Sequence, residues 1–155
     1  MRKNPGRNKN EKGNTLVEFA LSAPIALLFL LAAFDFGFYA YAFISVENAA
    51  RSAALRNSGG SESASDQSSA CKVAIEELKG LPNVTATTSC GSAPLRVTST
   101  LCQGSATCDG YSGTPDGSPA ASVTIAYTMP SVFRIAFTGP GIITRTSQMR
   151  MRTSQ

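Results

Sequence analysis

GNTLVEFALSAPIALLFLLAAFDFG, residues 13–37, is an apolar stretch interrupted by two carboxylates, Glu18 near its start and Asp35 further along. Between Phe19 and Val46, Asp35 is the only residue that carries a charge at neutral pH. About 20 apolar residues are enough to span a bilayer, so this stretch predicts a membrane-spanning helix. Carboxylates are costly inside a membrane, so an acidic residue within such a helix usually has a partner.

The positive charge of the chain lies in a short N-terminal leader. The net charge is +4, and residues 1–13 carry five basic residues and one acidic residue, whereas residues 14–155 carry nine of each. Basic residues next to a membrane segment stay in the cytoplasm. We therefore expect the N-terminus inside and everything after about residue 45 outside. Because no basic cluster lies on the folded domain, we expect no nucleic-acid binding.

Two other interpretations of this N-terminus remain open. A secretory signal peptide also has a basic start, an apolar stretch and a small-residue cleavage site. Ala40-Tyr41-Ala42 is such a site, although Pro24 and Asp35 are unusual within a signal peptide. An uncleaved anchor is the second alternative; it explains the length of the apolar stretch but not the carboxylate at its edge.

The helix is predicted to continue beyond the membrane, from about residue 15 to residue 57. The segment after Val46 is rich in alanine, and Glu47 and Arg51 have the spacing of a helical ion pair. Gly59-Gly60 is a typical helix end. Pro24 removes one backbone hydrogen bond and is expected to kink the helix within the membrane.

The remainder of the chain predicts a small domain with one helix and an antiparallel sheet. The segment 71–82 has apolar residues at helical spacing and ends at Gly80 and Pro82. Four β-branched stretches follow, separated by turns rich in Gly, Pro and Ser: 84–89, 95–101, 121–129 and 141–149. The predicted fold class is therefore α+β, with a long N-terminal transmembrane helix and a sheet of three or four strands.

The cysteines all follow the apolar stretch. Four thiols on the outer side of a membrane favour two disulfides, since that compartment is oxidising. Of the three possible connectivities we favour Cys71–Cys90 and Cys102–Cys108, and free buried thiols are the alternative. No C-x-x-C motif and no histidine accompany the cysteines, so we predict no metal site.

The spacing from Gly13 to Glu18 resembles the processing site of type IV prepilins. In that family a basic leader ends in glycine, and a glutamate follows at the fifth position of the mature chain. The resemblance implies cleavage between Gly13 and Asn14 by a membrane prepilin peptidase. It also implies that Glu18 neutralises the free α-amine of a neighbouring subunit during assembly.

The following residues are similar to the TadE-like segment of Flp (Tad) pilus proteins. The matching positions are Val17, Glu18, Phe19, Ala20, Pro24, Asp35, Phe36, Gly37, Asn48, Ala49, Ala50 and Arg51. Phe38 departs from the family, which often has a basic or polar residue after D-F-G. The resemblance implies a minor pilin or pseudopilin in the bacterial cytoplasmic (inner) membrane, crossing it once. The implied partners are the prepilin peptidase, inner-membrane lipid, and other pilin or pseudopilin subunits that contact the N-terminal helix.

Asp35 has two interpretations. It follows Glu18 by about 26 Å along a helix, so it can reach the outer interface and meet water or headgroups. Alternatively, it contacts a partner pilin helix, because Ala33 and Gly37 form a small-x-x-x-small pair beside it that permits close helix approach.

The sequence thus divides into four parts: a cytoplasmic leader (1–13), a transmembrane and stalk helix (14–58), a polar linker (59–70) and an extracytoplasmic domain (71–155). Without histidine there is no histidine-based catalytic site, and no phosphate-binding loop is present. We therefore predict no enzyme activity and no cofactor. The main alternative function is an uncleaved single-pass anchor whose disulfide-stabilised external domain binds a partner.

Overall fold

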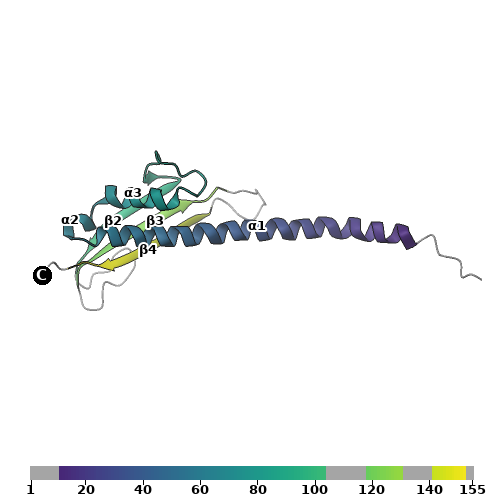
Figure 1. Ribbon diagram of the computed structural model, residues 1–155, viewed down its shortest axis with the longest axis horizontal. Coiled ribbons are helices and arrows are strands. Elements are labelled where there is room, and N and C mark those ends of the chain that lie inside the picture. The colour runs from purple at the N-terminus through teal and green to yellow at the C-terminus, as the bar shows by residue number, and fades with distance from the viewer. Residues whose placement is uncertain (1–10, 104–117, 131–140, 153–155) are drawn as a thin grey trace, which may run out of the picture. The chain divides into compact units, whose positions relative to one another are not determined.

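The computed structural model describes residues 11–103, 118–130 and 141–152, with side chains from residue 16 onward. The chain divides into two compact units, Met1–Phe38 and Tyr39–Gln155. We call the first the N-terminal unit and the second the head. The fold is α+β, as predicted: one long apolar helix, two short helices and an antiparallel sheet of four strands (Figure 1).

The first helix, α1, runs from Glu11 to Asn57 without interruption and includes Pro24. This confirms the long helix predicted from the sequence. Residues 39–57 of α1 belong to the head. There, α1 buries a stripe of small side chains at helical spacing: Ala42, Val46, Ala49, Ala50, Ala53 and Ala54. Alanine favours the helix and also lets the helix backbone approach the sheet closely.

Two helices follow in the region 61–78. Helix α2, Ser61–Ala64, lies in the segment expected to be a polar linker, where Ala64 is buried. Helix α3, Gln67–Leu78, includes most of the predicted second helix. Asp66 caps α3, since its side chain accepts hydrogen bonds from the backbone N–H groups of Ser68 and Ser69. These contacts give α3 a definite start before the first cysteine.

The sheet has the strand order β1-β2-β3-β4, and all pairs are antiparallel. The strands are β1 (Gly91–Ser92), β2 (Leu95–Cys102), β3 (Ala120–Thr128) and β4 (Ile142–Arg150). Strands β2, β3 and β4 agree with three of the four predicted stretches. Helix α3 contacts β2, whereas β4 forms the opposite edge of the sheet.

The predicted strand at 84–89 is wrong, because this segment forms turns. Thr88 Oγ1 accepts a hydrogen bond from Thr85 N at 2.8 Å, and Thr88 N donates to Thr85 O at 2.9 Å. Threonine hydroxyls can satisfy nearby backbone groups in this way and so compete with a sheet. The β-branched residues that suggested a strand therefore include threonines that stabilise a turn in this segment.

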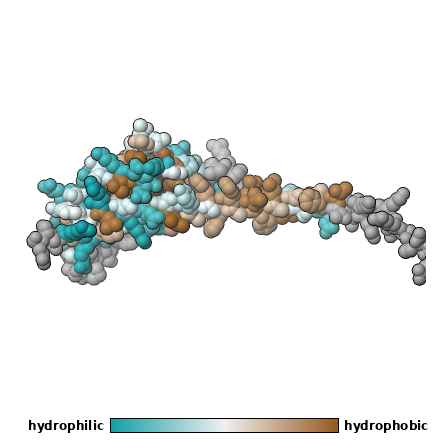
Figure 2. All heavy atoms as spheres, in the orientation of Figure 1, coloured by the Kyte–Doolittle hydropathy of each residue, from teal (hydrophilic) through white to brown (hydrophobic). Residues whose placement is uncertain are grey.

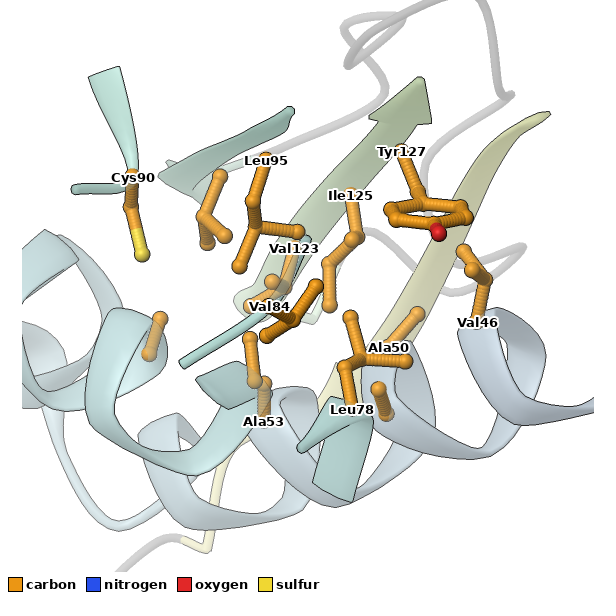
Figure 3. Packing of buried hydrophobic residues seen from close by; sticks show 14 of the residues in the cluster. Val46, Ala50, Ala53, Leu78, Val84, Cys90, Leu95, Val123, Ile125 and Tyr127 are labelled. Atoms are coloured by element: carbon orange, nitrogen blue, oxygen red, sulfur yellow. The ribbon is translucent and has the colours of Figure 1, made fainter. Parts of the chain in front are cut away.

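The core of the head lies between the alanine stripe of α1, helix α3 and one face of the sheet. Figure 3 shows Ala50 and Ala53 of α1 with Leu78 of α3 and Ile125 of β3. Alternate residues of the central strand point into this core: Ala121, Val123, Ile125 and Tyr127. The C-terminal part of α1 is therefore a structural layer of the head.

The disulfide between Cys71 and Cys90 links α3 to the segment that precedes β1, with a Cα–Cα distance of 5.8 Å. It is one of the two pairs favoured from the sequence. Cys102, at the end of β2, is also disulfide-bonded. Cys108, its favoured partner, lies outside the described residues.

Replacing both Cys71 and Cys90 by alanine is expected to destabilise the head by about 2–4 kcal/mol, because the disulfide restricts the unfolded chain. Urea unfolding of the full chain, followed by circular dichroism, measures the loss. The double variant Cys71→Ser, Cys90→Ser provides the control for the choice of side chain, since it leaves the disulfide of Cys102 intact. An unchanged unfolding midpoint in the double variant would contradict this prediction.

Candidate assembly helix

The N-terminal unit exposes apolar side chains on all sides of α1. The exposed large residues are Leu16, Val17, Phe19, Leu21, Ile25, Leu27, Leu28, Phe29, Leu30, Phe34 and Phe36. Figure 2 shows this apolar surface, and it also shows that hydrophilic side chains are frequent on the head. A continuous apolar surface of this size requires lipid or protein around it. By length and composition, α1 is able to cross a membrane.

Glu18 lies at the start of this apolar surface and is exposed. Within the described residues it has no ion-pair partner, because the recorded ion pairs all lie in the head. Its position follows from the helix, which continues through the residues on both sides of it. An unpaired carboxylate at the edge of a lipid-facing surface is suited to a cation from another chain.

Asp35 lies near the other end of the N-terminal unit and is half-buried. Its neighbours Phe34 and Phe36 are both exposed. The helix separates Asp35 from Glu18 by about 26 Å, so the two carboxylates do not form one site. A side chain added at Gly37 would meet nothing within 4 Å, so the surface beside Asp35 is open.

The remaining predicted site residues lie on the same helix. Gly13 and Asn14, at the predicted cleavage point, lie in the first turns of α1. Pro24 lies within α1, and the helix continues on both sides of it. The structure therefore arranges Gly13, Glu18, Pro24 and Asp35 along one helix, in the order of the sequence, without gathering them into a pocket.

Glu47 pairs with two arginines where α1 packs on the sheet. Arg51 Nε lies 3.2 Å from Glu47 Oε1, as the helical spacing predicted. Arg145 of β4 places its Nε 3.6 Å from Glu47 Oε2, and its guanidinium lies 3.8 Å from the centre of the Phe43 ring. The sequence analysis missed Arg145, since only the fold brings β4 next to this part of α1.

Asn57 closes the C-terminal end of α1 with a buried hydrogen-bond network. Its Nδ2 donates to Asp66 O at 3.0 Å and to Ser99 Oγ at 2.8 Å. Ser99 Oγ in turn donates to Ala64 O at 2.7 Å. These bonds join α1, α2 and β2. The sequence analysis missed Asn57 as well, because an asparagine at a helix end has no pattern that identifies its partners.

Several groups in the head have shifted pKa values. The hydrogen bond from the Ser68 side chain, with those from the backbone of Ser69 and Ser68, lowers the pKa of Asp66. The hydrogen bond and charge of Glu76 raise the pKa of Lys79. Burial raises the pKa of Tyr127. These groups belong to a helix cap, a surface ion pair and the core, and no group of three potential metal ligands occurs among the described residues.

Comparison with known protein families gives a match, and it falls on α1. The model of the TadE-like protein family matches residues 13–55, so the chain carries a TadE-like domain that includes most of α1. This confirms the resemblance inferred from the sequence. Comparison with curated proteins and with solved structures gives no match.

Proposed function

We propose that this chain is a minor pilin or pseudopilin of a Tad pilus, cleaved after Gly13 and assembled through its N-terminal helix. The observation that carries the proposal is Glu18, which is exposed at the start of the apolar surface and has no ion-pair partner among the residues whose side chains are described. The TadE-like match begins at residue 13, so it includes both the expected cleavage site and Glu18. The role is structural, and no catalytic residue is assigned.

The free N-terminus that cleavage creates supplies the partner for Glu18. An α-amine has a pKa of about 7.7–8 and is therefore largely cationic at neutral pH. Within lipid, an isolated carboxylate and an isolated ammonium group are both unfavourable, and a close pair between two chains reduces the cost of each. The pair forms only between the Glu18 of one subunit and the processed Asn14 of a neighbour, so it links processing to assembly.

Topology follows from the charges. The five basic residues of the leader remain in the cytoplasm, where the peptidase acts, and the head lies on the opposite side of the inner membrane. An oxidising compartment on that side allows the Cys71–Cys90 disulfide to form and persist. The proposed partners are thus the prepilin peptidase, membrane lipid and other pilin subunits.

Mass spectrometry of the N-terminus tests the proposal directly. The chain is recovered from membranes of cells that contain, or lack, the prepilin peptidase of the same pilus system. We expect a start at Asn14 when the peptidase is present, and a start at Met1 when it is absent. A Gly13→Val variant is expected to start at Met1 in both cells, since the peptidase requires a small residue before the cleaved bond.

The other results would overturn the proposal in different ways. A start at Met1 in both cells would identify an uncleaved anchor, which leaves the external domain as a membrane-anchored binding protein. A start at Phe43 would identify a secreted domain released by signal peptidase. In that case neither Gly13 nor Glu18 would be present in the mature chain.

A further inference from the structure

Strand β4 runs beside the head part of α1, in the same direction. Near its beginning, Arg145 contacts Phe43 and Glu47 of α1. Beyond its end, Arg152 N donates a hydrogen bond to Ser58 O at 3.1 Å. The seven residues from Arg145 to Arg152 extend about 23 Å as a strand. The helix covers about 20 Å from the level of Phe43 and Glu47 to Ser58. The strand and the helix are therefore of similar length over this region and run side by side.

This alignment gives the level of Ile142, the first residue of β4. Ile142 precedes Arg145 by three residues, which is about 10 Å along a strand. The same distance along a helix corresponds to about six or seven residues. About six or seven residues before the level of Phe43 and Glu47, helix α1 is at Tyr39. Ile142 therefore lies level with Tyr39, where the head begins.

A second set of contacts places the same residues at the same end. A Cβ added at Gly80 would lie 3.4 Å from the Tyr41 hydroxyl, so the turn after α3 is close to Tyr41. Two residues later, Pro82 O accepts a hydrogen bond from Tyr127 Oη at 2.8 Å. Tyr127 is paired in register with Ile143, the neighbour of Ile142. Tyr41, the turn at Gly80 and the start of β4 are therefore one end of the head.

This end exposes large apolar and aromatic side chains. We define the apolar base as Tyr39, Tyr41, Ile44 and Ile142. The exposed fraction is 41% for Tyr39, 56% for Tyr41, 59% for Ile44 and 67% for Ile142. In the head, Leu55 is the one other large apolar residue that is equally exposed among those described. Among the described residues of the head, four of the five large exposed apolar side chains thus lie at the end where the chain leaves the N-terminal unit.

We infer that the apolar base is a lipid-contacting surface that sits in the interfacial region of the outer leaflet. Lipid is the occupant because Tyr39, Tyr41 and Ile44 are the last large exposed residues of the apolar stretch 19–46 of α1, so covalent continuity keeps the base at the outer end of the membrane-spanning segment. Tyrosines are enriched at that level, where the ring lies among the acyl chains and the hydroxyl meets the headgroups. Lys79, exposed beside Gly80, suits the same level because its ammonium group can reach the headgroups.

The inference rests on the proposed placement of α1 in a membrane but does not require cleavage or pilus assembly. It assigns Ile142, some hundred residues after the transmembrane segment, to the lipid interface. In this arrangement the head contacts the bilayer surface through the three α1 residues and the one β4 residue of the apolar base. A subunit that leaves the membrane for a filament must then withdraw Ile142 from lipid.

Tryptophan fluorescence tests the inference, since the chain contains no tryptophan. Single variants Ile142→Trp and Tyr41→Trp of the full chain are placed in lipid nanodiscs. The matched control is Leu55→Trp, an exposed position on α1 about 21 Å beyond Tyr41. Circular dichroism and the urea midpoint identify variants that retain the fold, and Tyr41→Trp keeps an aromatic residue if Ile142→Trp does not fold.

We expect blue-shifted emission from Ile142→Trp and Tyr41→Trp. Lipids brominated near the top of the acyl chains should quench most of this emission, whereas Leu55→Trp should emit as in water and remain unquenched. Equal emission and quenching at all three positions would overturn the inference. Blue-shifted emission at Ile142→Trp without quenching by brominated lipid would also overturn it, because it would identify a protein contact. Neither result would bear on cleavage after Gly13, which the N-terminal measurement decides separately.

Discussion

Glu18→Leu is expected to abolish incorporation of the chain into pili while leaving its membrane insertion intact. Leucine is favourable in lipid, whereas an acidic residue within a membrane helix costs up to about 2.5–3.5 kcal/mol. Insertion should therefore be unchanged or improved. Assembly should fail, because the processed α-amine of a neighbouring subunit loses its counter-ion. The measurement compares the amount of the chain in sheared pili with the amount in membranes.

Ser22→Leu is the matched control, since it also replaces a polar residue by leucine one helical turn away. Ser22 is exposed and its hydroxyl donates to Phe19 O at 3.2 Å, a local bond within the helix. We expect this variant to insert and assemble as the parent chain does. Loss of assembly in both variants would mean that added apolarity, and not the missing carboxylate, is responsible.

Glu18→Gln separates charge from hydrogen bonding. Glutamine keeps the size and a hydrogen-bond acceptor but removes the negative charge, so assembly should fall sharply without insertion being affected. The N-terminus of each variant is measured as well, since a variant that is not cleaved tests the peptidase and not the assembly contact. Normal piliation with properly processed Glu18→Leu would contradict the assigned role of Glu18.

Much of the fold could be predicted from the sequence because its long elements have strong periodic patterns. The apolar stretch and the alanine-rich segment after it predicted α1, and alternating β-branched residues predicted β2, β3 and β4. The segment 84–89 has the same composition, but its threonines bond to the local backbone. Composition alone does not distinguish these two uses of threonine. The buried alanine stripe also shows why residues 39–57 pack as part of the head.

The candidate site was predictable only in part, for a physical reason. The roles proposed for Gly13 and Glu18 come from their spacing in the sequence, and the described residues contain no ion-pair partner for Glu18. Arg145 and Asn57 are different, because their contacts join segments far apart in the sequence. Such contacts depend on strand order and helix placement, and no local pattern specifies them.

Tyr127→Ala is expected to cost about 3–5 kcal/mol of stability, the largest loss we predict for a single side chain in the head. Tyr127 is fully buried on the central strand β3 and packs against the core that α1 and α3 cover. Removing its ring leaves a cavity that the paired strands on both sides cannot close. The measurement is urea unfolding of the full chain in nanodiscs, followed by circular dichroism.

Tyr127→Phe isolates the hydroxyl from the ring. This variant keeps the packing but leaves the Pro82 carbonyl without the hydrogen bond that Tyr127 Oη donates at 2.8 Å. A loss of about 1–2 kcal/mol is expected. Tyr39→Phe is the control, because Tyr39 is exposed and its hydroxyl has no recorded partner within the described residues. Equal losses for Tyr127→Phe and Tyr39→Phe would mean that the Pro82 contact does not stabilise the head.

The same pair of variants predicts a change in alkaline stability. Burial raises the pKa of Tyr127 above its ordinary value of 10.0, so the folded head holds this proton more tightly than the unfolded chain. The neutral Tyr127 hydroxyl therefore contributes to the free energy of unfolding, and this contribution is fully present below pH 10.0. It is lost as the pH rises through the raised pKa of the folded state. Tyr127→Phe should not show the loss of stability at alkaline pH that ionisation of Tyr127 causes, whereas Tyr39→Phe should still show it. Identical curves of unfolding midpoint against pH for the two variants would contradict a buried, neutral Tyr127.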